Sequence, residues 1–181
     1  MSRIMQAWER VLNNAVAQDF DTQQDAIFQI GLVLERHHQP NMDAGHLYED
    51  NLPRELQRLT LNEKRQQDAV HYLASMAAQH PGKADGFIYA MGRARPALMI
   101  DALLALIAAQ DTRMNDAAAY QSVQALLNCL KNPDDTVRAA LEQSDPTDTL
   151  EAWAERDDDE LVAATERALA RLDDLFDEID K

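Results

Sequence analysis

The stretch ADGFIYAMGRARPALMIDALLALIAAQ, residues 84–110, holds the densest run of apolar side chains in the chain. Pro96 separates two apolar segments, 84–94 and 96–109, and each is long enough to form a helix. Proline fits the first turn of a helix but disfavours helical backbone in the residue before it. The stretch therefore predicts two short helices packed back to back as a hairpin. The side chains expected to be buried between neighbouring hairpins are those of Ile88, Met91, Leu103 and Leu106.

The rest of the chain also favours helix. Glycine is scarce at 5 residues, Ala, Leu, Gln and Glu are abundant, and strand-type runs are absent. Further helices are expected over residues 1–18, 21–38, 60–79, 115–131, 137–143, 150–156 and 158–180, from apolar positions at spacings of three and four. Asp21 or Thr22 is expected to cap the second helix, and a capping box at Thr60 and Glu63 the third. Residues 41–59 fit at most two short turns.

The net charge of −15 limits the classes of function. An acidic surface repels phosphate backbones and anionic membranes, so we expect no nucleic-acid or membrane partner, whereas a basic protein partner is compatible. From Thr147 onward the chain carries 13 acidic and 4 basic side chains, a net charge of −9. We therefore divide the chain into a helical-hairpin domain, 1–146, and an acidic C-terminal segment, 147–181, packed on it as a cap or an addition. The apolar stripe of the last helix would suit either that packing or a homodimer.

Nothing in the sequence indicates a targeting signal or a membrane span. The N-terminal residues carry charges throughout, and the longest apolar run, 102–109, is far too short to cross a bilayer. A cytoplasmic location is expected. The one cysteine, Cys129, excludes an internal disulfide. Its place beside apolar core positions predicts a buried structural thiol rather than a nucleophile.

Three segments share a pattern that suggests degenerate internal repeats: residues 25–31, 68–74 and 86–92. Each has an aliphatic residue, a second apolar residue three positions later, and then a small residue. The small residues are Gly31, Ala74 and Gly92. A small side chain at this position lets a neighbouring helix approach closely.

Residues 126–141, LLNCLKNPDDTVRAAL, resemble a HEAT repeat, in which an Asp-containing turn precedes a helix that opens with Val-Arg. Residues 87–95, FIYAMGRAR, with the apolar helix after them, are similar to HEAT-like repeats of the bilin-lyase type. The resemblance implies a short right-handed α-solenoid of antiparallel helical hairpins that serves mainly as a protein-binding surface. It also implies structural roles for Asp134, Asp135 and Arg138 at the junctions between repeats. A non-repetitive helical bundle is the alternative fold.

Histidines and carboxylates near the second helix suggest a metal site. His37, His38 and His46 lie close in sequence to the carboxylates of Asp43, Glu49 and Asp50, but their spacing matches no zinc motif. We interpret them as a polar helix end and a solvated loop. Residues 157–160 lack the alternating ligands and the glycine of a calcium-binding loop, and are interpreted as a turn with a helix cap. No metal, cofactor or catalytic residue is expected.

Three side chains are the candidates for partner binding. Arg93 and Arg95 lie at a predicted turn, where they would line a rim that meets an acidic partner or a phosphate. The alternative is that they, with Arg113 and Arg138, pair with the chain's own surplus carboxylates. Trp153 stands between two alanines in an acidic helix and is the third candidate, as a docking residue.

The expected function is that of a non-catalytic protein-interaction module. An adaptor, a scaffold, or an acidic inhibitor of the immunity type that covers a toxin's basic site would each fit. The alternative is an enzyme or a small-ligand binder that uses polar residues gathered in the groove of the helical stack, such as the histidines and tyrosine near residues 41–59.

Overall fold

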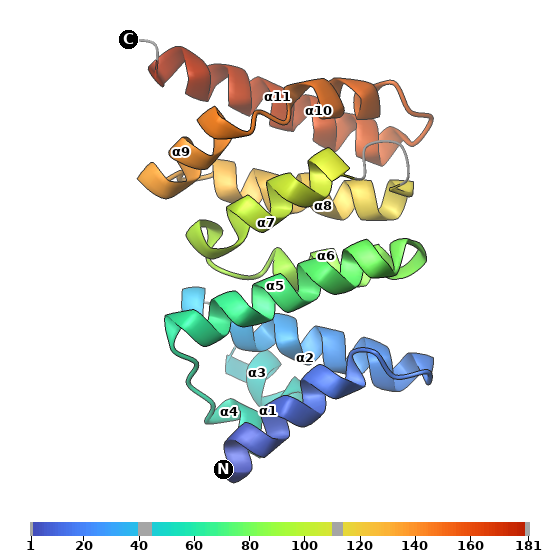
Figure 1. Ribbon diagram of the computed structural model, residues 1–181, viewed down its shortest axis with the longest axis vertical. Coiled ribbons are helices and arrows are strands. Elements are labelled where there is room, and N and C mark those ends of the chain that lie inside the picture. The colour runs from blue at the N-terminus through green and yellow to red at the C-terminus, as the bar shows by residue number, and fades with distance from the viewer. Residues whose placement is uncertain (1, 40–44, 110–113, 180–181) are drawn as a thin grey trace.

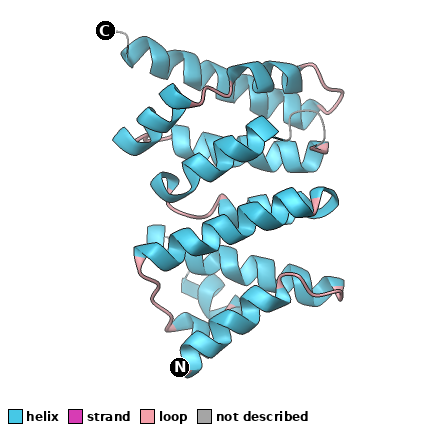
Figure 2. Cartoon of the chain, in the orientation of Figure 1, coloured by secondary structure: helices cyan, strands magenta, loops and turns pink. Residues whose placement is uncertain are grey.

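The computed structural model describes residues 2–39, 45–109 and 114–179; for Gly45, His46 and Ile179 it describes the backbone alone. Within these ranges the chain forms eleven α-helices and one short 3-10 helix, with no strand (Figure 2). The all-α fold expected from the composition is confirmed.

The helices follow one another with short connections. Their bounds are α1 Arg3–Asn14, α2 Phe20–His38, α3 Gly45–Asn51, α4 Arg54–Gln57, α5 Glu63–Gln79, η1 Pro81–Lys83, α6 Ala84–Met91, α7 Pro96–Ala109, α8 Asp116–Leu130, α9 Asp135–Gln143, α10 Thr147–Ala154 and α11 Asp159–Ile179. The interrupted segment forms the short helices α3 and α4, in line with the two turns expected there.

Two of the expected helix caps are wrong. Asp19, and not Asp21 or Thr22, caps α2, because its carboxylate accepts from the Thr22 backbone N–H at 2.9 Å. Asn62 caps α5 in place of the predicted capping box at Thr60. Because Asn62 is the cap, α5 begins at Glu63, and the Leu61 N–H before it donates to Nε2 of His37 in α2.

The helices stack along the long axis of the molecule, with the N-terminus at one end and the C-terminus at the other (Figure 1). One series of helices pack side by side in the order α2, α6, α8, α11. A second series, α5, α7 and α9, packs in the same way beside it. Helix α1 packs on α2, α5 on α6, α7 on α8, and α10 on α11, so the two series form two layers.

The predicted pairing of residues 84–94 with 96–109 is wrong, although both helices exist. Helix α6 packs on α2, α5 and α8, and α7 packs on α5, α8 and α9, whereas α6 and α7 make little contact with each other. The turn at residues 92–95 carries the chain from one helical pair to the next. The four side chains expected to be buried, Ile88, Met91, Leu103 and Leu106, are all buried, which confirms that part of the prediction.

Glycines set the distance between neighbouring helices of the first layer. A Cβ atom added at Gly31 of α2 would lie 2.9 Å from Cδ of Arg93 and 3.3 Å from Cα of Ala90. A Cβ atom added at Gly92, at the end of α6, would lie 3.1 Å from Cβ of Ala125 in α8. The close helix approach predicted for the small residues of the repeated segments is therefore confirmed at Gly31 and Gly92.

The C-terminal helices share the core of the rest of the chain. One hydrophobic core runs from Trp8 in α1 to Leu175 in α11. The apolar stripe of α11 is buried within the chain, where α11 packs on α8 and α10, so a homodimer through this helix would need its other face. Trp153 is 0% exposed, which corrects its prediction as a docking residue. It follows the buried Leu150 by three positions on α10, and both side chains therefore face the core.

The segment that contains α3 and α4 is anchored to the end of α2. The Arg36 guanidinium donates to the carbonyl oxygens of Leu56, Gln57 and Leu59. His37 accepts the Leu61 N–H at 3.0 Å, which requires an unprotonated Nε2. Burial lowers the pKa of His37, and the nearby Arg36 lowers it further. These bonds add to the packing of α4 on α1 and to the burial of Leu52, Leu56 and Leu59.

We expect Gly31→Ala and Gly86→Ala, two helical glycine substitutions, to have opposite effects on stability. At Gly31 overpacking costs about 1–3 kcal/mol and exceeds the gain in helix propensity, so the free energy of unfolding should fall by about 1 kcal/mol. At Gly86 a Cβ atom would meet Ile27 Cδ1 at an ordinary 3.7 Å. The free energy should therefore rise there by about 0.5–1 kcal/mol. Urea unfolding measures both, and changes of the same sign would contradict the close approach at Gly31.

The lowered pKa of His37 predicts a loss of stability in mild acid. The unfolded chain takes up a proton near the ordinary value of 6.5, whereas folded His37 resists protonation until a lower pH. The unfolded state therefore binds more protons in this window, and the free energy of unfolding should decrease as the pH falls from about 7 to about 5. In His37→Gln this decrease should be smaller, because the lowered pKa of His38 still contributes to it but that of His37 no longer does. Urea unfolding at several pH values tests this, and an unchanged pH dependence would contradict it.

Candidate functional site

A surface cavity lies where three helices of the first layer end side by side. Its volume is about 500 Å³. We call it the helix-end groove. It is lined from the end of α2 by Glu35, His38 and Gln39, from the α6–α7 turn by Gly92, Arg93, Ala94, Arg95 and Pro96, and from the α8–α9 connection by Asn128, Lys131, Asn132 and Asp134.

The sequence ends the three helices at this edge of the molecule. Pro40 follows α2, Gly92 and Pro96 flank the turn after α6, and Pro133 follows α8. Proline disfavours helical backbone in the residue before it and cannot continue a helix. The C-terminal end of a helix carries a partial negative charge, which basic side chains offset. This accounts for the gathering of basic residues at one edge of an acidic protein.

Arg93 is held within the chain. Its guanidinium pairs with Glu35 of α2 and donates to the Tyr89 hydroxyl. Its Cζ lies 4.6 Å from the Tyr89 ring centroid and 5.9 Å from that of Phe28. The side chains of Arg93 and Glu35 are only 20% and 13% exposed. The Arg93 predicted to bind a partner thus joins α2 to α6, as in the alternative weighed for it, and forms one wall of the groove.

Arg95 and Lys131 carry the accessible positive charge of the groove. Arg95 pairs with Glu63 of α5 at 2.9 Å, but the two side chains are 46% and 69% exposed. An ion pair this exposed contributes little stability and exchanges readily with an external anion. Lys131 is exposed, and its side chain makes no hydrogen bond or ion pair with the described part of the chain. Asn128 and Asn132 supply amide groups beside it.

Among the other ionisable side chains of the groove, Glu35 is ion-paired, whereas the carboxylate of Asp134 keeps its negative charge. Burial lowers the pKa of His38, Arg95 lowers it further and Glu35 opposes them, so this imidazole is neutral at pH 7. Glu35 is paired with Arg93, and the Asp134 carboxylate accepts the Val137 N–H at 3.0 Å as the cap of α9. Arg95 and Lys131 are the side chains that could hold an anionic group here, such as a carboxylate or a phosphate, against the negative charge of Asp134.

The remaining candidate residues have structural surroundings. Cys129 is buried, and burial together with Asp134 raises the pKa of its thiol to about 12, in agreement with a structural role. Arg138 pairs with Glu178 of α11 at 3.4 Å and so joins α9 to the last helix. Arg113 and Asp43 lie outside the described residues, as does the side chain of His46. Among the side chains that are described, no three or more His, Cys, Asp or Glu are grouped to hold a metal ion.

Residues missed at the sequence level complete the groove. Lys131, Asn128 and His38 were not predicted to bind a partner, and they reach the groove only because α2, α6 and α8 end together. A scan of family models, a search of curated proteins and a search of solved structures found no match to this chain. No helix in the described ranges has the length and apolar character that crossing a membrane requires.

Substitution of the two neighbouring arginines should separate their roles. Arg93→Met is expected to lower the free energy of unfolding by about 2–3 kcal/mol, because Glu35 loses its partner in a largely buried position. Arg95→Met should change it by less than about 0.5 kcal/mol, because the pair it breaks is exposed. Adding Glu35→Gln to Arg93→Met should recover part of the loss. Equal effects of the two single variants, measured by urea unfolding, would contradict this assignment.

Proposed function

We propose that this protein is a non-catalytic protein-interaction module, built as a short HEAT-like α-solenoid. The observation that carries the proposal is the helix-end groove, where Arg95 and Lys131 remain accessible in an otherwise acidic protein. The two-layered order of the helices supports the solenoid interpretation, because solenoid repeats contact mainly their neighbours in sequence. The Arg138–Glu178 pair between α9 and α11 is consistent with the structural role that the HEAT resemblance implies for Arg138.

The partner of the groove would carry an acidic segment. Two cationic side chains beside the amides of Asn128 and Asn132 suit a peptide with neighbouring carboxylates. The acidic exterior also suits a basic partner, including the site of a toxin in an inhibitor of the immunity type. We favour the groove as the binding surface because its two accessible cations and its amide groups line one cavity.

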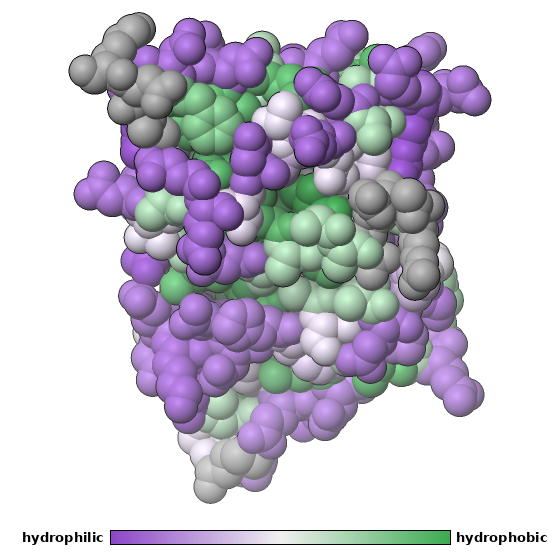
Figure 3. Space-filling view, turned by 45° about the horizontal axis from the view of Figure 1, so that its top comes forward, coloured by the Kyte–Doolittle hydropathy of each residue, from purple (hydrophilic) through white to green (hydrophobic). Residues whose placement is uncertain are grey.

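The second candidate is a small-ligand binder, and one cavity favours it. Helices α7 and α9 line a hollow of about 340 Å³, in which Leu104, Ala105, Ala108 and Ala140 form the apolar part and Asp101, Gln143 and Ser144 the polar part. Hydrophilic residues cover much of the face drawn in Figure 3, and a hydrophobic area lies near its middle. A ligand that raises the melting temperature without any protein partner would favour this alternative.

Affinity capture with matched variants tests the proposed function. Arg95→Glu with Lys131→Glu reverses the accessible charges of the groove. Arg58→Glu with Lys64→Glu makes the same change of net charge at exposed positions outside it. A stoichiometric partner should be retained by the unmodified protein and by the control, and lost from the groove variant.

A defined probe gives the same test in a purified system. A fluorescent peptide rich in glutamate should bind the unmodified protein and the control alike, and bind the groove variant about tenfold more weakly by anisotropy, since two charges are reversed. Equal binding by all three proteins would contradict the role of the groove.

A further inference from the structure

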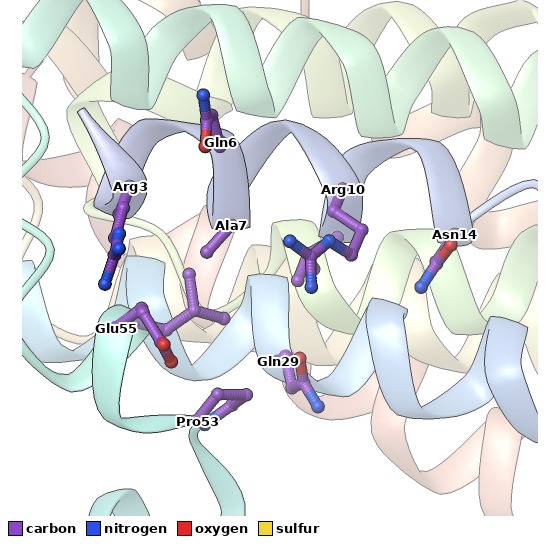
Figure 4. Close-up of a pocket in the computed structure, with 10 residues that line it drawn as sticks. Arg3, Gln6, Ala7, Arg10, Asn14, Gln29, Pro53 and Glu55 are labelled. Atoms are coloured by element: carbon purple, nitrogen blue, oxygen red, sulfur yellow. The ribbon is translucent and has the colours of Figure 1, made fainter. Parts of the chain in front are cut away.

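The two ends of the helical stack carry grooves of opposite charge. At the N-terminal end, α1, α2 and α4 line a cavity of about 470 Å³ that contains Arg3 and Arg10 (Figure 4). At the C-terminal end, α10 and α11 line an open cavity of about 600 Å³ that contains Asp148, Glu151 and Glu155. Neither cavity shares a residue with the helix-end groove.

The N-terminal groove has two accessible cations over a partly apolar floor. Both arginines are exposed, and neither makes a hydrogen bond or an ion pair with the residues that the structure describes. In Figure 4 both project from α1 into the space above α2, and the amides of Asn14 and Gln29 lie on the same side. Ala7, Val11, Pro53 and Leu56 supply the apolar part of the lining, and Glu55 stands at one end.

These arginines lie on the side of α1 that faces away from α5. Met5 of α1 contacts Arg65 of α5, and the Tyr72 hydroxyl of α5 donates to the Leu12 carbonyl. Arg3 lies two positions from Met5, and Arg10 lies two positions from Leu12. Since successive residues of a helix are about 100° apart, the arginines lie about 200° round α1 from the side that meets α5.

The carboxylates of α10 are placed in the same way at the other end. Leu150 and Trp153 face the core, and Asp148 and Glu155 each lie two positions from one of them. These carboxylates therefore also point about 200° away from the buried side. They are exposed, and no described residue pairs with them. Leu169 of α11, with Ala152 and Ala154, supplies the apolar part of this groove.

The spacing of the two charge sets matches. Arg3 and Arg10 are seven positions apart, and so are Asp148 and Glu155, the residue that directly follows α10; seven positions correspond to about 10 Å along a helix. The helices α1 and α2 form the first packed pair of the stack, and α10 and α11 the last. A contact between these ends would continue the stack from one copy into the next.

From this complementarity we propose that the protein associates head to tail with a second copy of itself. The N-terminal groove of one copy takes the acidic face of α10 and α11 of the next. The contact is heterologous, so it leaves one free end on each side and permits longer chains. The net charge of −15 opposes association at long range. At about 0.15 M salt the Debye length is about 8 Å, so this repulsion is screened while charge pairs in contact remain.

Charge reversal at each end tests the proposal in the full chain. The variants are Arg3→Glu with Arg10→Glu at one end, and Asp148→Lys with Glu155→Lys at the other. Sedimentation velocity at about 0.15 M salt should give an association constant at least about tenfold lower for either variant alone. An equimolar mixture should regain the association of the unmodified protein, because each variant then meets an end of opposite charge. Regained association also shows that both variants are folded.

Three outcomes would overturn the proposal. The first is an unmodified protein that stays monomeric up to about 1 mM, the concentration range of the weakest specific contacts. The second is association in either variant equal to that of the control Arg58→Glu with Lys64→Glu. The third is a glutamate-rich peptide whose binding is lost in Arg3→Glu with Arg10→Glu, while the equimolar mixture of the two charge-reversal variants stays monomeric. The N-terminal groove would then serve another protein.

Discussion

The contact between Arg93 and the backbone at Gly31 is the constraint on which the rest of the structure depends. Without a Cβ atom at Gly31, α2 approaches α6 closely enough for the aliphatic part of Arg93 to lie across it. The guanidinium then reaches Glu35 and the rings of Phe28 and Tyr89. One side chain therefore combines apolar packing, an ion pair in a largely dry position and two aromatic contacts, which fixes the relative position of α2 and α6.

This contact also determines where the helix-end groove lies. Because α2 and α6 are held at Gly31, and α6 and α8 at Gly92, the three helices end at one edge. The C-terminal ends of these helices concentrate partial negative charge at this edge, and the basic side chains there offset it. The Arg93 side chain is enclosed between α2 and α6, whereas Arg95 and Lys131 remain at the surface. The turn at residues 92–95 thus supplies both Arg93, which holds α2 against α6, and Arg95, which remains accessible in the groove.

The positions of the helices along the chain were predicted well from the sequence. Which helices pack against each other was predicted poorly. Pro96 and the apolar run after it gave the bounds of α7, and the broken segment gave the short helices α3 and α4. The pairing of helices failed because a turn permits several geometries, and the choice depends on which helices can approach closely. Small residues were the one useful signal, since Gly31 and Gly92 mark the closest contacts.

Candidate site residues were harder to predict for the same physical reason. Trp153 stood out because its neighbours are alanines and acids, yet its spacing from Leu150 turned it toward the core. Arg93 and Arg95 are two positions apart and therefore point to different sides, so one is enclosed and the other is exposed. Lys131 and His38 belong to the groove only through tertiary packing, which no pattern along the chain records.

Native-state hydrogen exchange tests most directly whether the close packing of α2, α6 and α8 underlies the fold. Backbone amides near Gly31, Ala90 and Ala125 should exchange only through global unfolding, with protection equal to the full free energy of unfolding. Amides of α1 and α10, at the two ends of the stack, should exchange through local opening with lower protection. Greater protection in α10 than in the middle of α2 and α6 would contradict this account.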